Sequence, residues 1–243
     1  VRTIVDVSIA GRAPKNDPAL FALAMASKLG DEVTKKAARE ALPAVARIGT
    51  DLFHFARYVE VFGGWGRGTR NAVARWYTDR PLDQLVYQMV KYQSRDGWSH
   101  RDLLRLAHPS PASSAHAALH AWSGRWEKPH DGVASDLACL VDGTVDPEGG
   151  VGIGLVAAFE AAKRATSVKE IVKLVEECKL THEMLPTEWL KEPTVWSVLL
   201  PHMRLWAMVR NLGRMTANGL VAPLSLGAAK VVEKLSDAEE IKR

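Results

Sequence analysis

The chain has 243 residues, of which 47% are hydrophobic and 25% are charged, a balance typical of folded globular proteins and unlike that of disordered chains. Its formal net charge of +4 and isoelectric point of about 9.1 suit a phosphate-rich partner, although many basic proteins bind no nucleic acid. Two cysteines without CxxC spacing argue against a disulfide scaffold or zinc knuckle, and no apolar run approaches the roughly 20 residues of a membrane span. We therefore expect a cytoplasmic protein.

Helical periodicity runs along almost the whole chain. In residues 32–47, for example, Val33, Ala37, Ala41 and Val45 recur at fourfold spacing, as on the buried face of an amphipathic helix. In chain order, the predicted helices span residues 1–10, 18–28, 32–47, 51–60, 67–77, 82–92, 151–164, 168–177, 195–212 and 224–235.

The predicted helices are joined by short breaks that carry turn residues, and strand alternation is absent. This pattern predicts an all-α fold in which antiparallel helix pairs stack as an α-solenoid, with a compact helical bundle as the alternative. Residues 127–152, which are rich in glycine, are expected to form an exposed excursion.

The positive charge is local. Residues 67–105 contain eight Lys or Arg and four Asp, an excess equal to that of the whole chain. Within this region, Lys91 and Arg95 are four residues apart and are expected to share one face where a helix ends. The pair Asp96-Gly97 then breaks the helix, and Ser99 is placed to cap the next helix with Asp102 in a capping box.

The helix that follows is expected to present a basic stripe. Arg101, Arg105 and His108 fall at positions i, i+4 and i+7, and Pro109 ends the helix. Arginine forks match phosphate oxygens, and the rings of His108 and Trp98 offer stacking faces to unpaired bases. The segment is therefore a candidate surface for RNA.

Plainer interpretations apply to the same residues. A basic stripe on a helix is usually a solvated face. Trp98 could be packed at the junction of two helices rather than serve as a stacking platform. His100 is expected to be a neutral histidine at the surface or in the capping turn.

The segment Gly97 to His108, GWSHRDLLRLAH, with Lys91-Tyr92 ahead of it, resembles the signature segment of the Ro proteins, whose RNA-binding region is the TROVE domain. Further resemblances lie in the family's order and cover nearly the whole chain: residues 18–24, Trp65 to Arg67, Asn71-Ala72, Trp76-Tyr77 and residues 209–218.

The resemblance implies a ring of HEAT-like helical repeats that binds noncoding RNA in RNA quality control. In this family, Y RNAs bind the outer face and single-stranded 3′ ends of misfolded RNAs enter the central hole; a 3′-to-5′ exoribonuclease could be recruited through the RNA. The matching positions here are Lys91, Arg95 and His108. Arg67 and Arg70, on one predicted helical face, are second candidates. No DNA or membrane partner is implied.

We expect a single TROVE domain over residues 1–243, truncated at both ends. Complete family members carry a von Willebrand A-like domain with an Asp-x-Ser-x-Ser metal site, whereas here Asp6-Val7-Ser8 is followed by Ala10 at the last position. No spacing brings a nucleophile and a base together, so we expect no catalytic activity, cofactor or metal. The competing hypothesis is a helical protein–protein scaffold without intrinsic RNA affinity.

Overall fold

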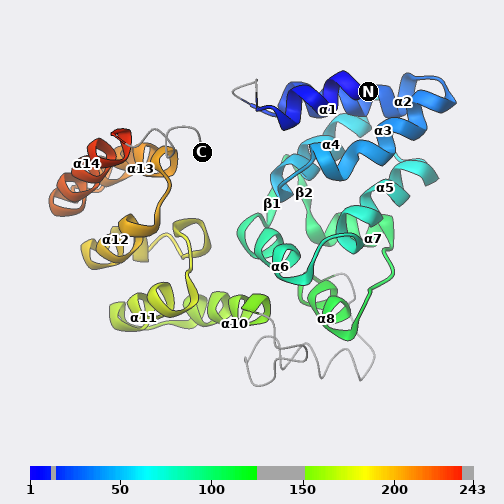
Figure 1. Cartoon of the computed structure of the whole chain (residues 1–243). Coiled ribbons are helices and arrows are strands. Elements are labelled where there is room, and N and C mark those ends of the chain that lie inside the picture. The colour runs from blue at the N-terminus through cyan, green and yellow to red at the C-terminus, as the bar shows by residue number, and fades with distance from the viewer. Residues whose placement is uncertain (12–14, 125–150, 237–243) are drawn as a thin grey trace. The chain divides into compact units, whose positions relative to one another are not determined.

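A computed structural model of the chain describes residues 1–11, 15–124 and 151–236 (Figure 1). The contacts divide the chain into two compact units, Val1–Ile153, here called unit 1, and Gly154–Arg243, called unit 2. The single domain and the ring of repeats, of which the chain is expected to form the larger part, remain predictions. The expected excursion at 127–152 falls, up to residue 150, outside the described residues.

Unit 1 is built from consecutive helices joined by short links, and its only described strands form one small hairpin (Figure 1). The predicted all-α class is confirmed. One described helix, α8, is missing from the prediction, because its alanine-rich sequence offers little contrast between its faces. The elements are α1 (Arg2–Ile9), α2 (Asp17–Leu29), α3 (Glu32–Val45), α4 (Gly49–Val61), α5 (Arg67–Thr78), α6 (Leu82–Lys91), β1 (Ser94–Arg95), β2 (Trp98–Ser99), α7 (His100–Ala107) and α8 (Ser114–Trp122).

Unit 2 repeats the same architecture of packed helices. The single helix predicted over residues 195–212 is wrong: α12 ends at Leu199, and Pro201 lies in a short 3-10 turn before α13 begins. Proline lacks the backbone donor that would continue the helix. The boundary between the units falls inside α10 (Val151–Arg164). The elements that follow are α11 (Val168–Cys178), η1 (His182–Met184), η2 (Trp189–Lys191), α12 (Pro193–Leu199), η3 (Leu200–His202), α13 (Leu205–Ala217) and α14 (Val221–Leu235).

None of the helices among the described residues is long and apolar enough to cross a membrane.

The aromatic core of unit 1 lies where α4, α5 and the start of α7 meet. Trp76 and Tyr77 are fully buried, and the Trp76 Nε1 donates a hydrogen bond of 2.7 Å to the carbonyl oxygen of Ala46. The Arg80 guanidinium lies 4.2 Å from the centre of the Trp76 ring and donates to the same oxygen. Arg80, one of the eight local cations, is therefore half-buried and held against the core.

His100 also belongs to this core. Of the two expected positions, the capping turn is confirmed, because His100 directly follows the N-cap Ser99, and the surface is wrong. Its side chain is only 3% exposed, and its ring lies 4.8 Å from that of Phe53. Its Nδ1 is 2.8 Å from the Tyr77 hydroxyl. Burial lowers the pKa of His100 to about 4, so the imidazole is neutral at pH 7. The residue secures the start of α7 to α4 and α5.

Candidate nucleic-acid interface

The segment between α6 and α7 is a β-hairpin. Helix α6 ends at Lys91, and Arg95 lies on β1, where it pairs with Trp98 across the turn. Asp96 and Gly97 both have positive φ, 53° and 81°, as expected for the type I′ turn that Asp-Gly favours. The prediction that Lys91 and Arg95 share a helical face is therefore wrong. A two-residue strand is too short to show alternation in the sequence.

Contacts to α4 and to the loop that follows it hold the hairpin in place. The imidazole of His54 donates from Nδ1 to the carboxylate of Asp96, and its Nε2 lies 3.5 Å from the carboxylate of Asp17 on α2. The Trp98 Nε1 donates to Glu60 over 3.2 Å, and its ring packs 5.3 Å from that of Trp65. These contacts favour the packed-junction interpretation of Trp98, whose role in stacking a base remains a prediction.

Replacing Gly97 with alanine should lower the free energy of unfolding by about 1 kcal/mol, because an L side chain is strained at this positive φ. Open space surrounds the position where the new Cβ would lie, so a steric clash adds nothing to this cost. Thermal unfolding would measure the loss. Gly213→Ala, at an exposed position inside α13 without positive φ and with similarly open surroundings, is the control, because alanine there should cost no stability. A Gly97→Ala variant as stable as the wild type would contradict the assigned turn.

The two cations at the hairpin differ in how they are held. The Lys91 Nζ donates to the Tyr87 hydroxyl over 3.1 Å and lies 5.3 Å from the ring centres of Tyr87 and Tyr92. Arg95 is exposed, and its side chain forms no hydrogen bond or ion pair with the described residues. Arg95 is thus available to an external anion, whereas Lys91 is already supported by aromatic rings.

Helix α7 begins as predicted. The Ser99 Oγ accepts from the backbone nitrogen of Asp102, and the Asp102 carboxylate accepts from that of Ser99 over 3.0 Å, which confirms the capping box. Leu103 and Leu104 are buried. The cap orders α7 and so fixes the direction in which its exposed face points.

The predicted basic stripe of α7 is divided by the end of the helix. Arg101 is exposed, while Arg105 is half-buried and already engaged within the chain. His108 is exposed but lies beyond the helix, at the cap, in the left-handed conformation with φ 48°. There its side chain lines a groove beside α3 and α5.

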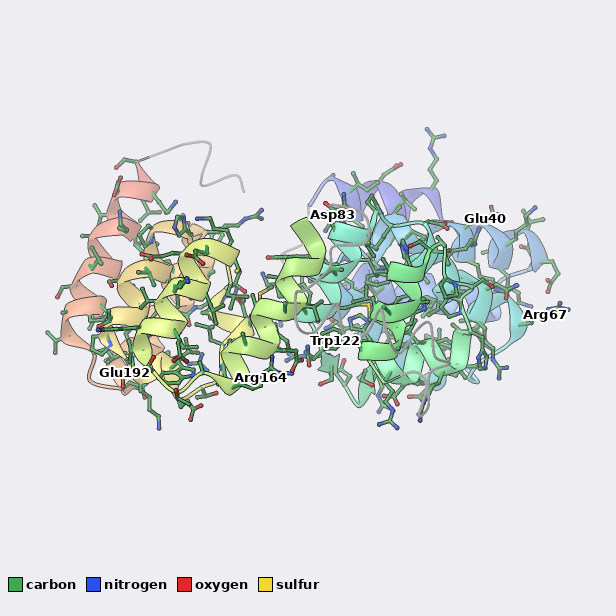
Figure 2. The ribbon with its side chains drawn as sticks, turned by 90° about the horizontal axis from the view of Figure 1, so that it is seen from below. Glu40, Arg67, Asp83, Trp122, Arg164 and Glu192 are labelled. Carbon is green, nitrogen blue, oxygen red and sulfur yellow. The ribbon has the colours of Figure 1, made fainter. Side chains whose placement is uncertain are left out.

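Arg67 and Arg70 on α5 are both exposed, and Figure 2 shows Arg67 at the outer edge of unit 1. The opposite side of this helix carries Thr69, Val73 and Trp76 into the core. Since α5 packs against α7, the exposed cations of both helices belong to one unit.

All eight predicted residues lie in unit 1, but they are not equivalent. Five have exposed side chains that form no hydrogen bond or ion pair within the described part of the chain: Arg67, Arg70, Arg95, Arg101 and His108. Sequence reasoning missed the cations that share the groove with His108, because α3 lies far from this segment in the sequence and carries no recognisable motif. The described residues contain no group of three or more His, Cys, Asp or Glu that could hold a metal ion.

Comparisons with known proteins place the chain among relatives. The family model of the TROVE domain matches residues 1–129. The chain is similar to the RNA-binding protein RO60 of Deinococcus radiodurans, with 34% identity over 245 residues that cover 100% of this chain and 43% of that protein. It is also similar to RNA-binding protein RO60 of Caenorhabditis elegans, with 28% identity over 296 residues that cover 98% of this chain and 46% of that protein.

The solved structures include a similar fold. The crystal structure of the Deinococcus radiodurans RO (RSR) protein matches with a TM-score of 0.75 and 34% sequence identity, covering 100% of this chain and 46% of that one. The chain thus spans less than half the length of these relatives.

Proposed function

Because the chain belongs to the TROVE-domain family of Ro proteins, we propose that it binds small structured noncoding RNA, of the Y or Y-like kind, on the cationic surface of unit 1. The observation that carries the proposal is the set of five exposed basic side chains without partners among the described residues, on α5, the hairpin and α7. Exposed arginines bind phosphate through paired donors. From the family resemblance we further propose that the 3′ ends of misfolded RNAs are ligands and that the protein serves RNA quality control in the cytoplasm. A 3′-to-5′ exoribonuclease would be recruited through the bound RNA.

The cationic surface is suited to binding because contacts within unit 1 already hold its helix α7 and its hairpin in place. The capping box orders α7 and the contacts of His54 and Trp98 fix the hairpin. Preorganised side chains lose less conformational entropy on binding. Binding is proposed to occur without catalysis, so RNA incubated with the protein and magnesium should stay intact.

The direct test is RNA binding at several salt concentrations. Phosphate contacts release counterions, so the affinity for a Y-like RNA should fall steeply and linearly on a logarithmic scale as salt rises. A filter-binding titration between about 50 mM and 200 mM salt covers the informative range. Failure to bind structured RNA at low salt would overturn the proposal.

Replacing His108 with asparagine should weaken binding about fivefold with little change in melting temperature. His108 is exposed and makes no hydrogen bond or ion pair within the described chain, so its loss removes an external contact of about 1 kcal/mol. Asparagine tolerates the left-handed conformation, which keeps the end of α7 intact. Fluorescence anisotropy and thermal unfolding would be measured together. A collapsed melting transition would make His108 structural, and unchanged affinity would remove it from the interface.

A helical protein–protein scaffold is the second candidate, and one observation favours it. A depression of about 260 Å³ between α1 and α2 is lined by the apolar side chains of Ile4, Val7, Pro18 and Ala22, with polar side chains such as Asn16 beside them. Apolar depressions are common at protein interfaces. Nucleic acid that copurifies with the protein, and a 260/280 nm absorbance ratio that nuclease lowers, would favour RNA binding over this alternative.

A further inference from the structure

A groove of about 620 Å³ lies between α3, α5 and the residues that follow α7. Three cations contribute to its walls, against a single carboxylate, that of Glu40, which is labelled in Figure 2. The cations come from two helices: Lys36 and Arg39 from α3, and Arg75 from α5. His108 also lines the groove. The groove is therefore basic on both long walls.

The Arg39 guanidinium is held in position by its surroundings. It lies directly over Gly68, where an added Cβ would be only 2.6 Å from Nη1. Its Nη2 donates to the carbonyl oxygen of Ser27 over 3.2 Å, and its Nε is buried without an acceptor among the described residues. These contacts fix the positive charge of Arg39 at the wall of the groove.

Arg75 is fixed in a similar way from the opposite wall. Its Nη2 donates to the backbone oxygen of Arg39 over 3.3 Å, so one contact orders the side chain while its other nitrogens have no acceptor in the described chain. Lys36 and Asn71 are exposed at the rim, one on each helix, and make no side-chain hydrogen bond within the described residues. Together these groups offer several donors and a net positive charge.

We propose that this groove binds the phosphodiester backbone of an unpaired RNA segment, with Arg39 and Arg75 contacting phosphates and Asn71 contacting the strand between them. The inference rests on the proposed function and extends it to residues on α3. The volume is that of a ligand site and is too small for a duplex, whereas single strands can enter such grooves. His108 belongs both to the groove and to the proposed RNA surface, so a strand leaving that surface continues directly into the groove.

The test uses a variant that reverses the charge of the rim and spares the two arginines. In Lys36→Glu/Asn71→Asp, both changes fall on exposed side chains without hydrogen bonds in the described chain, so the melting temperature should hold. The matched control, Lys173→Glu/Asn218→Asp, makes the same change in charge at exposed positions of unit 2. Affinities for a fluorescent oligouridylate and for a fully paired RNA hairpin are measured by anisotropy.

We expect the groove variant to bind oligouridylate at least about tenfold more weakly than the wild type, while the control stays within about twofold. The paired hairpin should lose much less. Equal affinities of the groove variant and the control for oligouridylate would overturn the groove as a binding site, but not the proposed binding of RNA by unit 1. A wild type that binds neither RNA would overturn both proposals. Polyglutamate that competes as well as oligouridylate would assign the groove to acidic peptides instead. If the double variant melts early, Lys36→Ala alone is compared with Lys173→Ala.

Discussion

Replacing Arg67, Arg95 and Arg101 together with alanine will weaken the binding of a Y-like RNA by about 100-fold at low salt. Each side chain is exposed and makes no hydrogen bond or ion pair within the described residues, so the variant loses external contacts rather than internal ones. A charge-assisted contact is worth about 1 kcal/mol or more, and three of them give roughly a 100-fold change in affinity. Filter binding with a labelled RNA measures the effect.

The salt dependence gives a second, independent measure of the same variant. Each lost phosphate contact should reduce the slope of log affinity against log salt by roughly 0.7 to 0.9. The control Lys169→Ala/Lys173→Ala/Lys191→Ala removes three exposed lysines of unit 2 without side-chain partners in the described chain and should change neither quantity appreciably. Equal losses of RNA affinity in the two triple variants would show that binding depends on net charge alone. The assignment of the binding surface to unit 1 would then be wrong.

Acidification will destabilise the protein through His100. Burial lowers the pKa of this histidine from 6.5 to about 4, so protonation favours the unfolded state. The stability that the neutral imidazole provides is fully present above pH 6.5 and is lost as the pH falls towards 4. The loss grows by about 1.4 kcal/mol per pH unit in this window and reaches about 3 kcal/mol.

Urea unfolding at pH 7 and at pH 5 would measure this contribution. His100→Gln is the matched variant, because its amide can still form a hydrogen bond with the Tyr77 hydroxyl but does not titrate. Between pH 7 and pH 5, the free energy of unfolding of the wild type should fall by about 2 kcal/mol more than that of His100→Gln. Identical pH dependence in the two proteins would show that another group carries the effect.

His100→Ala should lower the free energy of unfolding by about 3 kcal/mol at pH 7, since it leaves a cavity and an unpaired Tyr77 hydroxyl.

The elements that could be predicted from the sequence are those with local causes. The capping box at Ser99 depends on neighbouring residues only and is present. The turn tendency of Asp96-Gly97 is also local, but the pair turns a hairpin rather than ending a helix, because α6 already ends at Lys91. The hairpin was mistaken for a continuing helix because four-residue spacing between Lys91 and Arg95 is compatible with either structure. The interruption at Pro201 was overlooked, although proline is a strong local signal.

Features set by tertiary contacts could not be read from the sequence in the same way. His100 stands in a polar segment beside Ser99 and Arg101, and only its packing against Phe53 and Tyr77 makes it a core residue. Arg39 resembles an ordinary solvated residue of an amphipathic helix, yet α5 brings Gly68 beneath its guanidinium. The groove depends on such contacts between distant segments.

The absence of a side chain at Gly68 couples two positions that are distant in the sequence, 39 and 68. Any side chain there would displace the guanidinium of Arg39, so a lineage that loses this glycine also loses the reason to keep an arginine at position 39. Conversely, a homologue that dispenses with the arginine frees position 68 to accept alanine, a better helix former. Positions 39 and 68 should therefore covary among homologues, with arginine at position 39 accompanied by glycine at position 68.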